Sequence, residues 1–330
     1  MGIRIAGTGS YVPEKILTNF DLEKMVETSD EWIRTRTGMK ERHIAAPDQA
    51  CSDLASQAAL NALDMAGLTA DELDFLIVAT ITNDKVFPST ACIVQRKIGA
   101  SNAGCLDIEA ACSGLLYGME LASGLIRGHK KGKYRNILVI GSEKLSNLVD
   151  WEDRNTCVLF GDGASALILQ ATDDDDDLIV ASEVKADGNY GDILQIPAGG
   201  SACPTTHETL DKKMHYMQMA GQDVFKQAVP AMVGSCKNVL AQAGVSPDEV
   251  AWLVPHQANF RIMKAVASRV GIPEERVYIN IEKYGNTSAA TVGLCLDEMV
   301  RGNQVKPGDY LLLTAFGGGL TWASVLLKWC

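Results

Sequence analysis

The chain repeats itself over a long period, and this repeat restricts the possible folds more than any other feature. AGLTADELDFLIV (66–78) is similar to AGVSPDEVAWLVP (243–255), and FGDGASALIL (160–169) is similar to FGGGLTWASVLL (316–327). Each copy of the first pair combines a helix end at glycine, a Thr or Ser N-cap, an acidic first turn and a strand. The period is far longer than that of a solenoid. We therefore expect two similar halves packed about a pseudo-twofold axis, with a functional site at their junction.

Short apolar runs alternate with longer amphipathic segments, which is typical of an α/β fold with helices covering the sheets. The pattern of residues 51–68 predicts a helix. Five consecutive aspartates (173–177) favour a solvated linker near mid-chain, so we expect the halves to be residues 1–174 and 175–330. Five apolar runs are predicted to be buried strands: residues 73–81, 136–143, 165–170, 251–256 and 309–316.

The charge and cysteine content exclude several classes of protein. The 30 basic and 41 acidic residues give a net charge of −11, which argues against nonspecific binding to nucleic acid or anionic membranes. No apolar run approaches the roughly 18 residues needed to cross a bilayer, and we expect no signal peptide. The nine cysteines are scattered without a C-x-x-C pair. We expect reduced thiols in a cytoplasmic protein, without a disulfide framework or a zinc site.

Cys112 lies between a predicted strand (105–110) and an apolar segment (113–126) that predicts a buried helix. At a helix N-terminus the backbone N–H groups and the helix dipole lower the pKa of a thiol, which favours a nucleophilic thiolate. Free cysteine is also among the most buried residue types. From its position alone, Cys112 is therefore more readily interpreted as a core residue.

Two further residues gain interest from the repeat. His256 ends the predicted strand 251–256, and Asn286 lies in an ordinary turn pattern. Asn286 has nearly the same place in the second half that Cys112 has in the first. A pseudo-twofold fold would therefore bring these helix N-termini together. The glycines of FGGGLTW (316–322) would let backbone N–H groups stabilise an oxyanion there.

Two motifs of other enzyme classes are incomplete. IRIAGTGSYV (3–12) begins like a dinucleotide-binding fingerprint, but the third glycine is missing and Pro13 follows at once. The chain also has no G-x-S-x-G nucleophile elbow. The sequence therefore argues against an NAD-dependent oxidoreductase and against a serine hydrolase.

Eight segments, taken together and in this order, resemble one enzyme family: residues 29–45, 87–95, 111–118, 160–166, 215–229, 255–262, 284–291 and 316–324. They resemble the thiolase-superfamily condensing enzymes of the β-ketoacyl-acyl-carrier-protein synthase III type. The resemblance implies a duplicated five-layer αβαβα architecture. It also implies a decarboxylative Claisen condensation of a short acyl-CoA, with acetyl-CoA the expected starter, and malonyl-acyl carrier protein. The implied reaction initiates fatty acid biosynthesis.

The catalytic triad of this family falls on Cys112, His256 and Asn286. Thiolases use a second cysteine and elongating ketosynthases two histidines, so a Cys-His-Asn set resembles the priming, decarboxylating branch. The resemblance implies that Cys112 is acylated and that the N–H groups of Cys112 and Gly318 form the oxyanion hole. Neutral His256 and Asn286 would donate hydrogen bonds to the malonyl thioester. No metal or redox cofactor is implied, because the CoA thioester is a substrate.

The resemblance also assigns binding residues. Trp32, Arg36 and Arg154 correspond to contacts of the CoA nucleotide. Phe87 corresponds to a residue that closes the acyl pocket of the neighbouring subunit, which implies a homodimer. The pantetheine channel would be lined by Asn259 and Phe316.

A basic patch would bind the acidic carrier protein. It consists of Lys226, Arg261, Lys264 and Arg269. Ser268 and Arg269 stand where the family has paired lysines, so we expect a weaker patch.

Alternatives within the superfamily are an acyltransferase to oxygen or nitrogen and a starter-specialised enzyme of secondary metabolism. A non-catalytic acyl-CoA-binding scaffold dimer is the alternative of another class, and the intact triad argues against it. Starter length and branching depend on the pocket and on loop 198–214, whose conformation does not follow from the sequence.

Overall fold

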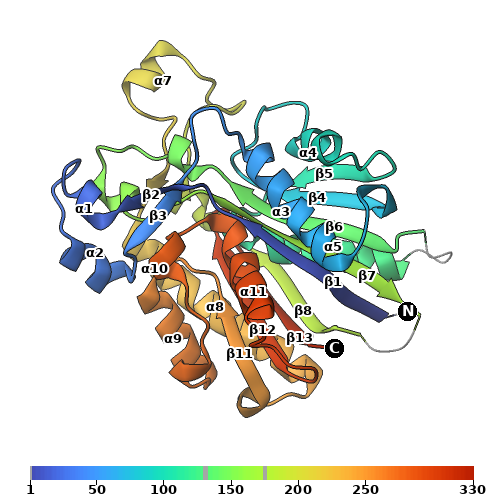
Figure 1. Cartoon of the computed structure of the whole chain (residues 1–330). Helices are drawn as coiled ribbons and strands as arrows, with labels where there is room; N and C mark the ends of the chain where they lie inside the picture. The colour runs from blue at the N-terminus through green and yellow to red at the C-terminus, as the bar shows by residue number, and fades with distance from the viewer. Residues whose placement is uncertain (1, 129–132, 174–176) are drawn as a thin grey trace.

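The computed structural model describes residues 2–128, 133–173 and 177–330. They form two large β-sheets enclosed by helices, of five and four strands, and two further sheets of two strands each (Figure 1). The five strands predicted from apolar runs are confirmed, and so is the strand predicted over residues 105–110, which is β5 (Gly104–Ile108). The predicted helix over 51–68 is α3 (Cys51–Ala66). The first sheet has the order β1 (Gly2–Tyr11), β7 (Gly163–Thr172), β6 (Asn136–Glu143), β4 (Phe75–Ala79) and β5 (Gly104–Ile108). The second has the order β11 (Val250–Pro255), β12 (Tyr310–Gly317), β13 (Thr321–Lys328) and β8 (Ile179–Ala186).

The sequence repeat corresponds to a repeat of sheet topology. In the first sheet β4 and β6 are parallel, and β7 and β1 follow antiparallel. In the second sheet β11 and β12 are parallel, and β13 and β8 follow antiparallel. The counterpart of β5 in the second sheet is reduced to a single parallel bridge between Leu253 of β11 and Val277. The two sheets are therefore copies of one four-stranded unit. Of the predicted linker, residues 174–176 lie outside the described residues.

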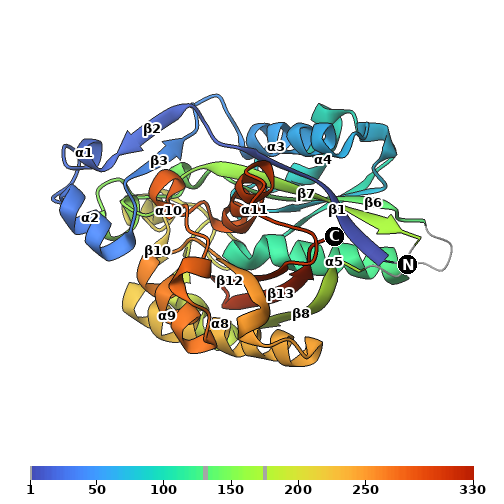
Figure 2. The same cartoon turned by 60° about the horizontal axis from the view of Figure 1, so that its bottom comes forward.

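The helices complete five layers (Figure 2). α3 and α4 (Thr90–Ile98) cover the outer face of the first sheet. α8 (Gly221–Ala243) packs on the outer face of the second sheet with α9 (Phe260–Val270) beside it. Between the sheets lie α5 (Gly114–Gly128) and α11 (Thr291–Arg301), each in contact with strands of both sheets. The αβαβα architecture expected from the resemblance is confirmed.

Apolar burial holds the middle layer in place. Leu115 and Met119 of α5 join Leu296 and Met299 of α11 in one core cluster with strands of both sheets. Full burial of each such side chain stabilises the fold by about 1.5–3 kcal/mol. The two middle helices are thus fixed relative to both sheets, and so are the turns that precede them.

The remaining elements gather mostly at one end of the molecule, and α7 projects from it (Figure 1). A core cluster that includes Ile33, Phe160 and Met263 packs several of these elements against the sheets. No helix among the described residues is long and apolar enough to cross a membrane. These elements are β2 (Lys15–Thr18), α1 (Asn19–Leu22), α2 (Asp30–Thr37), β3 (Glu41–Ile44), α6 (Arg154–Cys157), β9 (Leu194–Gln195), α7 (His207–Asp211), β10 (Gln218–Met219) and α10 (Ile281–Tyr284).

Candidate active site

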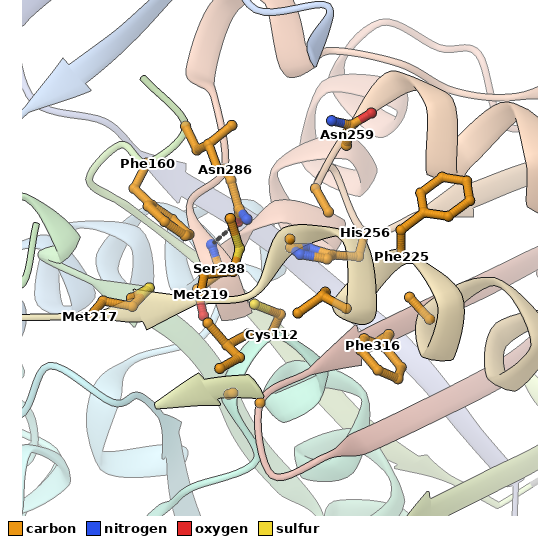
Figure 3. Close-up of a pocket in the computed structure, with 18 of the residues that line it drawn as sticks. Cys112, Phe160, Met217, Met219, Phe225, His256, Asn259, Asn286, Ser288 and Phe316 are labelled. Carbon is orange, nitrogen blue, oxygen red and sulfur yellow. Dashed lines mark hydrogen bonds between the residues drawn. The ribbon is translucent and has the colours of Figure 1, made fainter. Parts of the chain in front are cut away.

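A cavity of about 1230 Å³ lies where the two halves meet. Cys112 reaches it from the turn before α5, His256 from the residue after β11, and Asn286 from the segment after α10 (Figure 3). Phe316 and Gly318, at the end of β12, line the same cavity. The structure therefore brings together the three side chains that the sequence singled out, from both halves of the chain.

The turns before the two middle helices share an unusual backbone conformation. Ala111 and Ser288 have positive φ angles of 43° and 48°, a left-handed conformation that is strained for residues other than glycine. Each begins a 3₁₀ turn that leads directly into its helix, Ala111–Ser113 before α5 and Ser288–Ala290 before α11. We call these two turns the elbows. Because Ala111 matches Ser288, the residue that matches Cys112 is Ala289.

This correspondence corrects the expected equivalence of Cys112 and Asn286. Asn286 precedes Ala289 by three residues, so it lies before the elbow rather than in it. Neither residue is the first residue of an α-helix. The 3₁₀ turns shift both side chains away from the positions expected from the helix patterns. The prediction that both would come together at the junction still holds.

Each elbow packs closely against a glycine in a strand of the other half. A Cβ atom on Gly317 would lie 2.6 Å from the Cys112 amide nitrogen and 2.9 Å from the Ala111 Cβ. A Cβ atom on Gly141 would lie 2.3 Å from the Ala289 carbonyl oxygen. These distances are below any normal contact, so a larger residue at either position would displace an elbow.

The electrostatics of Cys112 differ from the sequence-based expectation. Burial raises the pKa of the Cys112 thiol to about 12, and the negative charge of Glu143 acts in the same direction. A hydrogen bond with Ser288 and one with the backbone amide of Cys112 lower the pKa, but burial outweighs them. The expected low pKa at a helix N-terminus is therefore wrong for the free protein. The thiol needs a proton acceptor to become a nucleophile.

His256 is held as a neutral imidazole. Its side chain is 2 % exposed, and burial lowers its pKa to about 3. The Nδ1 atom lies 2.7 Å from the Thr291 hydroxyl, and the backbone amide donates to the Thr314 carbonyl. The next residue, Gln257, accepts hydrogen bonds from the amides of Asn280 and Ile281. Gln257 thereby ties the His256 turn to the segment that leads to Asn286.

Hydrogen bonds hold both the backbone and the side chain of Asn286 in place. Its backbone amide donates to the Leu159 carbonyl, and its own carbonyl accepts from the Gly161 amide, so the first half fixes its position. The side-chain Oδ1 accepts a hydrogen bond of 2.8 Å from the Ser288 amide (Figure 3). With its oxygen committed to Ser288, the amide group offers its NH₂ end to a ligand.

Three residues beside the triad were missed by the sequence analysis. Thr291 is the first residue of α11, and Ser288 belongs to the same turn pattern as Asn286. Glu143 is the last residue of β6 and is completely buried. Burial of a carboxylate at the end of an otherwise apolar strand costs free energy unless the carboxylate is paired. The position of Glu143 at the end of such a strand was therefore the signal in the sequence that could have marked it as a candidate site residue.

The three residues expected to bind the CoA nucleotide lie beside one another. The guanidinium groups of Arg36 and Arg154 lie 4.6 and 5.2 Å from the centroid of the Trp32 ring. Trp32 and Arg36 line the main cavity. Arg154 lines a second cavity of about 450 Å³ and donates to the Glu27 carbonyl. Asn259 lines the main cavity and caps α9 through its side-chain oxygen.

The four basic residues expected to contact a carrier protein are exposed on α8 and α9. Two of them are paired with acidic neighbours. The Lys226 Nζ atom lies 2.8 Å from Asp223 Oδ1, and the Lys264 Nζ atom lies 2.6 Å from Glu274 Oε1. The other two are Arg261 and Arg269, and Arg261 also donates to the Thr35 carbonyl.

Phe87 lies elsewhere, in the loop between β4 and α4, with 85 % of its surface exposed. All nine cysteines lie among the described residues, and none of them forms a disulfide. No group of three or more His, Cys, Asp or Glu side chains suited to a metal ion occurs among the described residues.

Comparisons with known proteins show the family and the fold of the chain. Residues 106–188 match the family described as 3-oxoacyl-[acyl-carrier-protein (ACP)] synthase III, and residues 240–329 match its C-terminal family. The β-ketoacyl-[acyl-carrier-protein] synthase III of Caldanaerobacter subterraneus subsp. tengcongensis is 54% identical over 98% of this chain and 97% of its own length. The crystal structure of 3-oxoacyl-[acyl-carrier-protein] synthase III from Aquifex aeolicus VF5 has a TM-score of 0.91 and 48% identity, covering 99% of this chain and 100% of that one. The priming β-ketosynthase of the R1128 polyketide pathway has a TM-score of 0.91 and 32% identity, covering 99% of this chain and 96% of that one. The chain belongs to the β-ketoacyl-[acyl-carrier-protein] synthase III family.

Proposed function

We propose that Cys112, His256 and Asn286 catalyse the condensation of a short acyl-CoA with malonyl-acyl carrier protein, with loss of carbon dioxide. Family membership makes the chain an acyltransferase of fatty acid biosynthesis. The observation that carries the proposed residue roles is the meeting of these three side chains in one cavity between the halves. The first substrate that we propose is acetyl-CoA.

In the first step the Cys112 thiolate attacks the thioester carbon of the acyl-CoA. The bond to the CoA sulfur breaks, leaving an acyl-cysteine and a CoA thiolate that takes a proton from solvent. The backbone N–H groups of Cys112 and Gly318, both beside the cavity, would stabilise the oxyanion of the tetrahedral intermediate.

In the second step His256 and Asn286 donate hydrogen bonds to the thioester carbonyl of malonyl-acyl carrier protein. These bonds stabilise the enolate that forms as carbon dioxide leaves. The enolate carbon attacks the acyl-cysteine and releases a 3-ketoacyl-acyl carrier protein and the Cys112 thiolate. None of these steps uses a metal or a redox cofactor.

The proposed second step requires one tautomer of His256. The Thr291 hydroxyl lies 2.7 Å from His256 Nδ1 and 3.1 Å from the Ser288 carbonyl oxygen, and its single proton can be donated to either. We propose that it is donated to Nδ1, so that Nε2 carries the hydrogen. A neutral imidazole in this tautomer can donate to a substrate carbonyl, as the second step requires.

For substrate binding, we propose that the adenine of CoA stacks on Trp32 and displaces one of the two guanidinium groups beside it. The displaced arginine would then pair with phosphate. Asn259 and Phe316 would contact the pantetheine arm. The acidic carrier protein would dock on the basic patch formed by Lys226, Arg261, Lys264 and Arg269.

We further propose a cytoplasmic homodimer in which Phe87 closes the acyl pocket of the partner subunit. Its high exposure and the position of β5 at a sheet edge support this arrangement. We also propose residues 1–174 and 175–330 as the two halves, because the strands of the first sheet, β1 and β4 to β7, all precede the strands of the second sheet in the sequence.

Intact-mass measurement with acetyl-CoA tests the assignment. We expect a single acetyl adduct that Cys112→Ser abolishes, and carbon dioxide release when malonyl-acyl carrier protein is added. Asn286→Ala should still form the adduct but lose condensation, because one such donor contributes about 3–4 kcal/mol to the barrier. An adduct without decarboxylation in the unmodified protein would indicate an acyltransferase to another acceptor. No adduct would indicate a non-catalytic scaffold.

A further inference from the structure

Two cysteines outside the proposed active site face each other. Cys92 is the third residue of α4, and Cys105 lies on β5, the edge strand of the first sheet. Their sulfur atoms are 3.4 Å apart. Neither residue lines the main cavity. The contact therefore belongs to a separate place in the fold, where α4 packs beside β5 (Figure 1).

Hydrogen bonds on both sides of the thiol pair hold α4 against β5. On one side, the Asp107 carboxylate accepts a hydrogen bond of 2.7 Å from the Ala91 amide. On the other side, the side-chain amide of Gln95 donates to the Ala103 carbonyl at 3.1 Å. Each of the two cysteines lies between these contacts in the sequence. The short distance between the sulfur atoms is therefore set by the packing of the helix on the strand.

The two thiols differ in accessibility. Cys92 is exposed, whereas Cys105 is half-buried and packs against the core between α4 and the first sheet. Burial raises the pKa of the Cys105 thiol to about 11, and the neighbouring Cys92 thiol acts in the same direction. The thiolate is the form that attacks another sulfur atom, and the attack needs access to the reagent. Cys92 is therefore the thiol that reacts first with a reagent from solution.

We propose that Cys92 and Cys105 are a redox-active pair that a low-molecular-weight disulfide oxidises to an intramolecular disulfide. The Cys92 thiolate attacks one sulfur of the oxidant, whose S–S bond breaks, and the first thiolate leaves and takes a proton. Cys105 then loses its proton to solvent and attacks the Cys92 sulfur of the mixed disulfide. The second thiolate leaves and is protonated in turn. The protein exchanges two S–H bonds for one S–S bond, and the oxidant is reduced to two thiols.

The geometry favours the second attack. The two sulfur atoms must approach from 3.4 Å to a bond length of about 2 Å, which is a small movement. Because this attack is intramolecular, it is faster than attack by a second thiol from dilute solution. In the mixed disulfide the Cys92 sulfur carries no negative charge, so it no longer disfavours the Cys105 thiolate. Reducing thiols reverse both steps, so the pair remains a dithiol in a reducing compartment.

Oxidised glutathione is the probe that tests this proposal, and peptide mapping by mass spectrometry without reduction is the measurement. The unmodified protein, in its assembled state, should yield peptides joined through Cys92 and Cys105 that dithiothreitol separates. Cys105→Ser removes the second attacking thiol. We expect this variant to hold about 10-fold more glutathione on Cys92 than the unmodified protein, because the mixed disulfide is not resolved. Cys92→Ser should leave Cys105 unmodified.

Cys203→Ser is the matched control, since Cys203 is a partly exposed cysteine in loop 198–214. This variant should form the joined peptides to the same extent as the unmodified protein, and urea unfolding verifies that each variant is folded. A stable glutathione adduct on Cys92 without joined peptides in the unmodified protein would overturn the proposal. So would the absence of any reaction at Cys92 in the assembled protein. The inference does not depend on the proposed role of Cys112, so the two can fail separately.

Discussion

His256 Nδ1 and the Thr291 hydroxyl lie 2.7 Å apart, and this contact joins the proposed hydrogen-bond donor to the first residue of a middle helix. Both groups are buried. The contact therefore fixes the orientation of the imidazole before any substrate binds. In the proposed mechanism His256 donates a hydrogen bond in the second step, and a donor that is already oriented needs no rearrangement at that point.

Thr291→Val removes the hydroxyl and keeps the shape of the side chain. We expect the condensation rate to fall about tenfold, because the loss of one buried hydrogen bond costs about 1–2 kcal/mol and releases the tautomer. Acetylation of Cys112 should change little. The two rates are measured separately, by intact mass for acetylation and by carbon dioxide release for condensation. An equal fall in both rates would contradict the assigned tautomer and indicate a general disturbance of the site.

Gly317→Ala should damage the elbow that carries Cys112. The added Cβ would lie 2.6 Å from the Cys112 amide nitrogen, so the strand or the elbow must shift. We expect a loss of about 1–3 kcal/mol in the free energy of unfolding, together with slower acetylation. Gly124→Ala on α5 is the control, because its Cβ would meet nothing within 4 Å and alanine favours a helix. Urea unfolding checks both variants, and equal stability of the two would refute the steric argument.

Glu143 should make stability depend on pH in a defined direction. Its pKa rises from 4.5 to about 7 on folding, so the folded state holds the proton more tightly than the unfolded state. The resulting stabilisation is complete below about pH 4.5 and is lost as the pH rises to about 7. The full effect is about 3 kcal/mol. Urea unfolding at the two ends of this range should therefore show a decline in the unmodified protein that Glu143→Gln reduces. Parallel pH profiles of the two proteins would contradict the shifted pKa.

Arg261→Glu tests the basic patch. We expect a higher KM for the carrier-protein substrate and an unchanged KM for acyl-CoA, because a reversed charge repels an acidic partner. Lys237→Glu, further along α8, is an exposed charge reversal outside the patch and should leave both constants unchanged. The same KM increase for both substrates would indicate that Arg261 contacts CoA rather than the carrier protein.

The sequence predicted the larger features of this fold because they depend on local patterns. The repeat identified two equivalent sheets, and the apolar runs identified all five strands that were predicted from them. The position of Cys112 was also predicted well, because a strand, a small-residue turn and a buried helix follow one another along the chain. These features can be predicted from residues that are close together in the sequence.

The details of the site depend on contacts between residues far apart in the sequence. Glu143 and Ser288 are 145 positions apart, and no local pattern indicates that they meet. The left-handed backbone conformation of Ser288 is rare for serine. It is maintained by the surrounding structure, so the local sequence does not predict it. The direction of the Cys112 pKa shift was predicted wrongly because a helix N-terminus is a local feature, whereas burial results from the whole fold.

The matched elbows have a consequence for how such a protein can change in evolution. The fold holds two sites with the same backbone shape, and only one of them presents a thiol, since Ala289 stands where Cys112 stands in the other half. The folding free energy of the chain already maintains both elbow conformations. A duplicated ancestor could therefore move, lose or add a reactive side chain by single substitutions while the scaffold stayed unchanged. Divergence of chemistry between the halves needs no divergence of shape.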